Sequence, residues 1–236
     1  MNEWKNVWEK RPGSVETTED VFDMFCKLKA ADGFDVQTSE NYYPEMLQQW
    51  KDMNEAIKNG VKTPVRSVYE VGCGSGVNLY LFHQLAGMES LGGMDYSESL
   101  VRLAKQVLNT ADIICDEAIR LRESPKYDLV LSDSVFQYFY DEAYGMKVLE
   151  KMYQKAEQAV VITEIHDAAR REEHLEYRRS LVEDYDEKYK GLDKTYYSKE
   201  AFAEFAEQHG CRYEFLKPKN DAYWNNEFVF DFYLYL

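Results

Sequence analysis

A chain of 236 residues, 45% hydrophobic and 15% aromatic, can bury a sizeable core, which excludes a disordered polymer. Its 43 acidic and 28 basic residues give a formal net charge of −15, so its field repels polyanions, and we expect neither nucleic acid nor a membrane surface among its partners. No apolar run approaches the ~20 residues of a membrane helix, and the first residues lack a signal-peptide pattern, which predicts a cytoplasmic protein.

The first 60 residues predict a helical cap that carries tryptophans at positions 4, 8 and 50. One helix is expected after Thr17 or Thr18 as its cap, and a second from about Pro44 to Lys58, with Gly60 just past its end. Tyr42 and Tyr43 precede the second helix, and their hydroxyls either reach a ligand or the rings only pack.

Residues 65–165 alternate short apolar runs with amphipathic helices, which is typical of a parallel sheet. Expected strands are 65–71, 91–94, 111–115, 127–131 and 159–165, and the last four are each followed by a polar residue. The helix after the second strand is expected to be capped by Ser97.

Beyond His166 the pattern changes to a charged helical segment, from Asp167 to about Lys188, and a helix between Ser198 and Gly210. Residues 211–216 and 227–236 predict two strands, which should be antiparallel because their loop is too short for a crossover. We expect a single domain over 1–236: a cap at 1–60, a ligand-binding core at 65–165, a helical insertion or lid at 166–210, and terminal strands at 211–236.

The four cysteines are scattered and have no C-x-x-C spacing, so we expect no metal site and reduced, mostly buried thiols.

A glycine-rich turn follows the first strand, in Glu70-Val-Gly-Cys-Gly-Ser-Gly76. A dinucleotide site needs G-x-G-x-x-G, whereas here Val77 follows the third glycine. Glu70 lies where a pyrophosphate would pass, so the turn favours a ligand with positive charge.

Carboxylates also follow the second and third strands. Asp95 can accept hydrogen bonds from ribose hydroxyls, and Asp116-Glu117 lies where an adenine amino group could be met. Each aspartate alone is equally well a loop residue or a helix cap, but their joint placement predicts a nucleoside site.

Together with Met94-Asp-Tyr-Ser97, Cys115-Asp-Glu-Ala118 and Tyr127-Asp-Leu-Val-Leu-Ser-Asp133, the glycine turn resembles the class I S-adenosylmethionine-dependent methyltransferases. The resemblance implies an α/β, Rossmann-like, seven-stranded, mostly parallel sheet with helices on both faces and a terminal antiparallel pair. It implies that the glycine turn holds the methionine part, Asp95 the ribose, Asp116 and Glu117 the adenine, and 132–134 the sulfonium side. The cofactor-binding candidates are Glu70, Gly72, Cys73, Gly74, Gly76, Asp95, Tyr96, Ser97, Asp116, Glu117, Ser132 and Asp133.

His166 follows the fifth strand and is the candidate base for acceptor deprotonation, although it could instead cap or pack the next helix; Glu164 and Asp133 are alternative bases. The candidate acceptor pocket consists of Ser134, Phe136, Gln137, Tyr138, Tyr197 and Trp224. Asp133-Ser-Val-Phe136 departs from the N/D-P-P-Y/F motif of enzymes that methylate nucleobase or glutamine amides, which argues against those substrates. Arg170-Arg171 and Arg178-Arg179 favour a solvated face over a site for a substrate phosphate or carboxylate.

The sequence thus predicts a methyltransferase that takes S-adenosylmethionine, releases S-adenosylhomocysteine, and methylates a small molecule on oxygen or nitrogen by in-line displacement. One alternative is a non-catalytic, cofactor-binding activator subunit of another methyltransferase, which would bind cofactor without turnover. The other is an NAD(P)-dependent oxidoreductase, against which Val77 argues. A monomer or a homodimer is expected.

Overall fold

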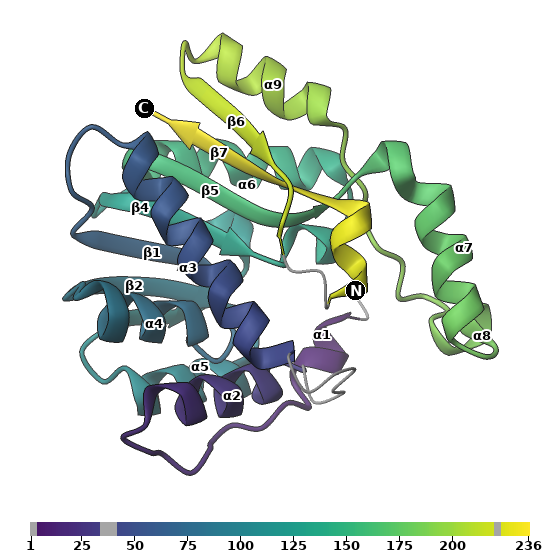
Figure 1. Cartoon of the computed structure of the whole chain (residues 1–236), viewed down its shortest axis with the longest axis horizontal. Helices are drawn as coiled ribbons and strands as arrows, with labels where there is room; N and C mark the ends of the chain where they lie inside the picture. The colour runs from purple at the N-terminus through teal and green to yellow at the C-terminus, as the bar shows by residue number, and fades with distance from the viewer. Residues whose placement is uncertain (1–3, 34–41, 220–222) are drawn as a thin grey trace.

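The computed structural model, which describes residues 4–33, 42–219 and 223–236, is built on one seven-stranded sheet (Figure 1). The strand order is β3-β2-β1-β4-β5-β7-β6. β1 to β5 pair in parallel, and β7 runs antiparallel to both β5 and β6. This confirms the expected fold class. The strands are β1 Ser67–Val71, β2 Ser90–Asp95, β3 Asp112–Cys115, β4 Tyr127–Asp133, β5 Ala156–His166, β6 Arg212–Leu216 and β7 Val229–Tyr235.

Helices cover both faces of the sheet, over two buried apolar clusters. One cluster lies under α2 to α5, and the other under α6 and α9. The helices are α1 Trp4–Trp8, α2 Val21–Ala31, α3 Tyr42–Gly60, α4 Val77–Ala86, α5 Glu98–Val107, α6 Glu142–Lys155, α7 Arg171–Leu181, α8 Tyr185–Lys188 and α9 Lys199–Gln208. Short 3₁₀ turns cover 118–120, 136–138, 168–170 and 224–228.

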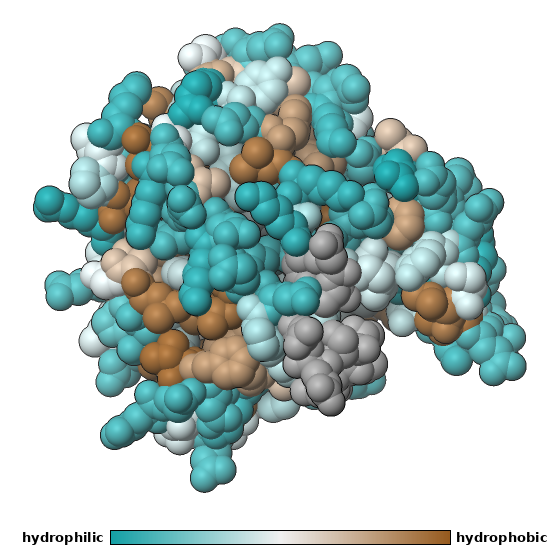
Figure 2. Space-filling view, in the orientation of Figure 1, coloured by the Kyte–Doolittle hydropathy of each residue, from teal (hydrophilic) through white to brown (hydrophobic). Residues whose placement is uncertain are grey.

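The carboxyl ends of β1 to β4 face α1 and the projecting pair α7–α8 (Figure 1). The face of the molecule in Figure 2 is mostly hydrophilic. Within the described ranges, no helix combines the length and the apolar character that crossing a membrane requires.

Several helix boundaries differ from the sequence-based expectation. α2 is capped by Asp20, whose Oδ1 accepts a hydrogen bond from the Asp23 amide at 2.8 Å, and not by Thr17 or Thr18. The single helix expected over 167–188 is divided, because Val182 leaves helical geometry and Asp184 has a φ of 54°. Ser97 caps α5 as predicted.

The cysteines are free, but they are less buried than expected. Cys73 is buried in the glycine turn, whereas Cys115 is exposed because β3 is the edge strand of the sheet.

Candidate active site

A cavity of about 320 Å³ opens at the carboxyl ends of β1 to β4. The glycine turn and the ends of these strands form one side, and residues of α1, α7 and the segment after α8 complete the lining. Its volume lies at the lower end of the roughly 300–1,000 Å³ of small-molecule sites. The cavity can therefore hold a cofactor-sized ligand with its polar groups against the strand ends.

The glycine turn needs its glycines for both conformation and space. Gly72, Gly74 and Gly76 have φ values of 77°, 51° and 83°, in the left-handed region. A Cβ at Gly72 would lie 2.4 Å from Val135 Cγ2, and one at Gly74 would lie 2.6 Å from an oxygen of Asp32. The backbone therefore passes close under the cavity, and Gly76 precedes the first residue of α4.

Asp95, at the end of β2, holds the glycine turn in place while it lines the cavity. Its Oδ2 accepts a hydrogen bond from the Gly74 amide at 3.0 Å, and its Oδ1 accepts one from the Ser97 amide at 2.8 Å. Burial raises its pKa. Each carboxylate oxygen keeps a second lone pair. Asp95 can thus still accept hydrogen bonds from a ligand in the cavity.

A second acidic corner joins the ends of β1 and β4. Asn78 donates one hydrogen bond to Glu70 Oε1 at 2.7 Å and another to Asp133 Oδ2 at 3.0 Å. Lys29 Nζ lies 3.7 Å from the same oxygen of Asp133. Glu70 Oε2 has no hydrogen-bond partner among the described residues, and burial raises the pKa of this carboxyl well above its usual value. A cationic ligand group would satisfy that oxygen.

Asp32 is a cavity residue that the sequence did not suggest, because an aspartate before Gly33 is typical of an ordinary turn. Its two carboxylate oxygens accept hydrogen bonds from the amide and the hydroxyl of Ser75, at 2.8 and 2.7 Å. Burial raises the pKa of Asp32 to about 7. The carboxyl therefore links α2 to the glycine turn at the wall of the cavity.

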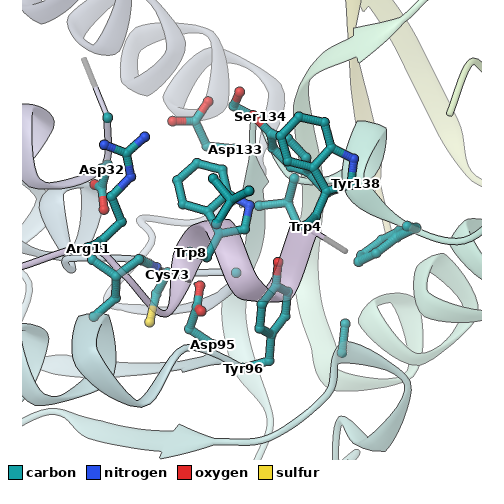
Figure 3. A pocket seen from close by; sticks show the side chains of 18 of the residues that line it. Trp4, Trp8, Arg11, Asp32, Cys73, Asp95, Tyr96, Asp133, Ser134 and Tyr138 are labelled. Atoms are coloured by element: carbon teal, nitrogen blue, oxygen red, sulfur yellow. Dashed lines mark hydrogen bonds between the residues drawn. The ribbon is translucent and has the colours of Figure 1, made fainter. Parts of the chain in front are cut away.

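α1 covers the cavity with Trp4, Trp8 and the following Arg11 (Figure 3). The Trp8 carbonyl accepts a hydrogen bond from the Ser97 hydroxyl at 3.1 Å, and Trp4 Nε1 donates to the Asp193 carbonyl at 2.9 Å. Both indole rings pack edge-on against the ring of Tyr138. Trp8 lies between Asp95 and Asp133 in Figure 3. The spacing of two tryptophans by four residues was the only sequence signal for this cover.

Most of the predicted site residues line the cavity together. They are Glu70, Gly72, Cys73, Gly74, Asp95, Tyr96, Asp116, Glu117, Asp133, Ser134 and Tyr138. Gly76, Ser97, Ser132, Phe136, Gln137, Tyr197 and Trp224 do not line it.

Three of the non-lining residues hold the backbone next to the cavity wall. The Ser132 hydroxyl donates to the Val71 carbonyl at 2.9 Å, and Gln137 Nε2 donates to the carbonyl and hydroxyl of Ser134. The buried Tyr197 hydroxyl donates to the Phe136 carbonyl at 2.8 Å. Their positions are set by strand and turn geometry, one layer behind the cavity wall.

His166 does not reach the cavity, which corrects its expected position. Its side chain is 1% exposed, and its ring packs against His174 and Tyr196 with centroids 4.7 and 5.2 Å away. Burial lowers its pKa well below the usual value. The ring points into this aromatic cluster under α7, which agrees with the alternative that His166 packs against the next helix. Tyr42 is buried against Tyr43 and Tyr223, which agrees with the packing alternative for its ring.

Residues 68–159 match a family model described as a methyltransferase domain. A malonyl-[acyl-carrier protein] O-methyltransferase from Anoxybacillus flavithermus is 28% identical over 98 residues, which are 41% of this chain and 38% of that protein. The chain spans less than two fifths of the length of the curated relatives that it matches.

Solved structures of low identity share the fold. The plantazolicin methyltransferase BpumL in complex with SAH has a TM-score of 0.62 at 17% identity, over 99% of this chain and 97% of that one. The magnesium protoporphyrin IX methyltransferase ChlM of Synechocystis PCC 6803 with bound SAH has a TM-score of 0.57 at 15% identity, over 92% and 98%. The matched family is the one that the sequence motifs resemble, so the resemblance and the cofactor that it implies are confirmed.

Proposed function

We propose that this chain, which belongs through residues 68–159 to the class I S-adenosylmethionine-dependent methyltransferases, transfers the methyl group of S-adenosylmethionine to a small molecule. The observation that carries the proposal is the gathering of the glycine turn, Asp95 and the Glu70–Asp133 corner around one cavity. These residues come from three separate strand ends, and they match in type the polar and charged groups of the cofactor.

The cavity fits the cofactor by the chemistry of its donors and acceptors. Asp95 keeps lone pairs for the ribose hydroxyls, and Asp116 and Glu117 line the wall beside it for the adenine amino group. Glu70 Oε2, which has no partner in the part of the chain that the structure describes, and the carboxylate of Asp133 suit the cationic amino and sulfonium side. The left-handed glycine turn lets the backbone approach the methionine part.

When bound, the cofactor supplies an electrophilic methyl group on a sulfonium. The contribution of the chain is to orient the acceptor and to exclude water. α1 serves the second purpose, because Trp4 and Trp8 lie over the cavity and are tied down at Asp193 and Ser97. None of the four histidines, all in described segments, lines the cavity. Asp133, one of the alternative bases, does line it, so this site suits an acceptor that is already ionised or whose proton Asp133 can take.

The proposal is tested by calorimetry with S-adenosylmethionine, S-adenosylhomocysteine and NAD(P), followed by an acceptor screen that detects S-adenosylhomocysteine release. We expect the first two ligands to bind and at least one class of small acceptor to be turned over. Binding of NAD(P) alone would contradict the proposal. Cofactor binding without turnover of any acceptor would favour an activator subunit.

A further inference from the structure

Three cationic side chains that line the cavity form no ion pair with a carboxylate of the described residues. Arg11 is one of them, and the other two are Arg178 of α7 and Lys194 in the segment after α8. Among the ion pairs of the described residues, none involves Arg178 or Lys194. Their neighbours behave differently, since Arg179 pairs with Asp186 at 3.0 Å and Lys190 with Glu187 at 3.9 Å on the outer surface. Arg178 and Lys194 thus have no ion-pair partner among the described residues, unlike the cations next to them on the outer surface.

Aromatic rings hold both cations in place. Lys194 Nζ lies 3.6 Å from the ring centroid of Tyr138 and 4.4 Å from that of Trp4. The guanidinium carbon of Arg178 lies 4.9 Å from the centroid of Tyr189 and 5.9 Å from that of Trp224. Contact with a ring face positions a cation without using its N–H groups. The donors of both side chains therefore remain available.

The electrostatics of this end of the cavity favour an anion. Arg178 Nε is buried and has no hydrogen-bond partner within the described residues. Burial and the nearby charge of Arg178 lower the pKa of Lys194 well below its usual value, while the carboxyl of Glu164 acts in the opposite direction. Two like charges held near one another in a partly buried site are unfavourable until an anion joins them.

The sheet topology places the two cations away from the proposed adenosine site. Lys194 contacts Tyr138, which follows β4, whereas Asp95 and Glu117 follow β2 and β3. In the sheet order, β1 separates β4 from β2 and β3. The cations therefore lie at the β4 side of the cavity, where Asp133 also lies. An acceptor approaching the sulfonium side would meet them there.

We propose that Arg178 and Lys194 bind a carboxylate of the methyl acceptor, so that the substrate class is a carboxylic acid with a planar or apolar body. A guanidinium presents paired N–H donors that match the two oxygens of a carboxylate, and the ammonium adds a further donor. The rings of Trp4, Tyr138 and Tyr189 beside the cations supply the apolar surface. This inference rests on the proposed function. A phosphate monoester also presents negatively charged acceptor oxygens, with a larger charge.

Calorimetry on the protein saturated with S-adenosylhomocysteine tests the assignment with 3-phenylpropanoate, indole-3-acetate, their primary amides, and phenyl phosphate. We expect at least one acid to bind about tenfold or more tightly than its amide, because only the acid offers a charged acceptor. Phenyl phosphate binding more tightly than both acids would overturn the carboxylate assignment.

Five variants locate the effect. Arg178→Gln and Lys194→Met should each weaken binding of the acid about tenfold and leave the amide unchanged, and Lys194→Arg should retain binding. The matched controls Arg179→Gln and Lys190→Met, which alter exposed cations, should change it less than about twofold. If Arg178→Gln does not fold, Lys194→Met with its Arg rescue carries the test.

Other outcomes distinguish a failure of this inference from a failure of the proposed function. Loss of S-adenosylhomocysteine affinity in Lys194→Met would overturn the inference, because the pair would then serve the carboxylate of the cofactor. Equal binding of acids and amides, or turnover of neutral and amine acceptors only, would overturn the inference and leave the methyltransferase proposal standing. Failure of the wild-type protein to bind the cofactor would refute the proposed function itself.

Discussion

The cavity has two ends that are built in different ways. At the proposed cofactor end, Glu70 and Asp95 lie at the carboxyl ends of β1 and β2 and are tied by hydrogen bonds to Asn78 and to the Gly74 amide. At the proposed acceptor end, side chains from α1, α7 and the segment after α8 meet mainly through ring and cation contacts. Under the proposed function, a hydrogen-bonded frame holds the cofactor and a separately assembled surface receives the acceptor.

The largest effect on cofactor affinity is expected for Asp95→Ala, which removes the hydrogen-bonding frame of the cofactor end. Affinity for S-adenosylhomocysteine should fall by about 1.5–3 kcal/mol, because bonds to a charged group are lost and the Gly74 amide is released. Calorimetry measures this. Asp128→Ala is the matched control, because Asp128 also accepts hydrogen bonds from two backbone amides, those of Arg66 and Ser67, but outside the cavity lining. Equal affinity of the two variants would remove Asp95 from the site.

His166→Ala should leave both ends of the cavity unchanged and should lower only the stability of the fold. Its buried ring packs against His174 and Tyr196, so the free energy of unfolding should fall by roughly 1–3 kcal/mol while cofactor affinity stays unchanged. Denaturant unfolding and calorimetry measure the two quantities. If stability is unchanged and turnover falls in a pH-dependent way, His166 would instead be supported as the base.

The pH dependence of stability tests the buried acid of the cofactor end. Asp32 keeps its proton in the folded state up to about pH 7, whereas its ordinary pKa is 3.8, so the folded state binds more protons in between. Stability from this group is therefore lost as pH rises from 3.8 to about 7, by up to about 1.4 kcal/mol per pH unit. Melting temperatures of the ligand-free wild type and Asp32→Asn should diverge across that range. Parallel curves would show that Asp32 is ionised throughout.

The smallest effect is expected for Trp4→Phe, which tests how α1 closes the acceptor end. The variant loses the bond to the Asp193 carbonyl but keeps a ring against Tyr138, at a cost of about 0.5–1.5 kcal/mol. Hydrogen exchange of the amides in 4–11 should become faster. Trp50→Phe is the control, since Trp50 Nε1 has no hydrogen-bond partner among the described residues. Unchanged exchange in Trp4→Phe would show that this bond does not hold α1.

Local patterns were sufficient for the sheet and for most of the cofactor end. Apolar runs, four of them followed by a polar residue, located β1 to β5, and the spacing of Gly72, Gly74 and Gly76 with Asp95 and Asp116 predicted a shared edge. These inferences succeed because parallel strands place their carboxyl ends together, so position along the strand determines position in space. The same reasoning misplaced His166, because following a strand does not determine which way a side chain is directed.

What the sequence by itself determined is therefore the α/β class, the glycine turn and the row of carboxylates at the strand ends. Only the tertiary structure decided that Trp8 and Arg11 cover the cavity, that Asp32 holds Ser75, and that Arg178 faces inward while Arg179 faces solvent. Adjacent arginines are indistinguishable in a charged helical pattern, because their roles depend on which helix face packs against distant aromatic rings. Contacts between residues far apart in the chain do not produce a periodic pattern in the sequence.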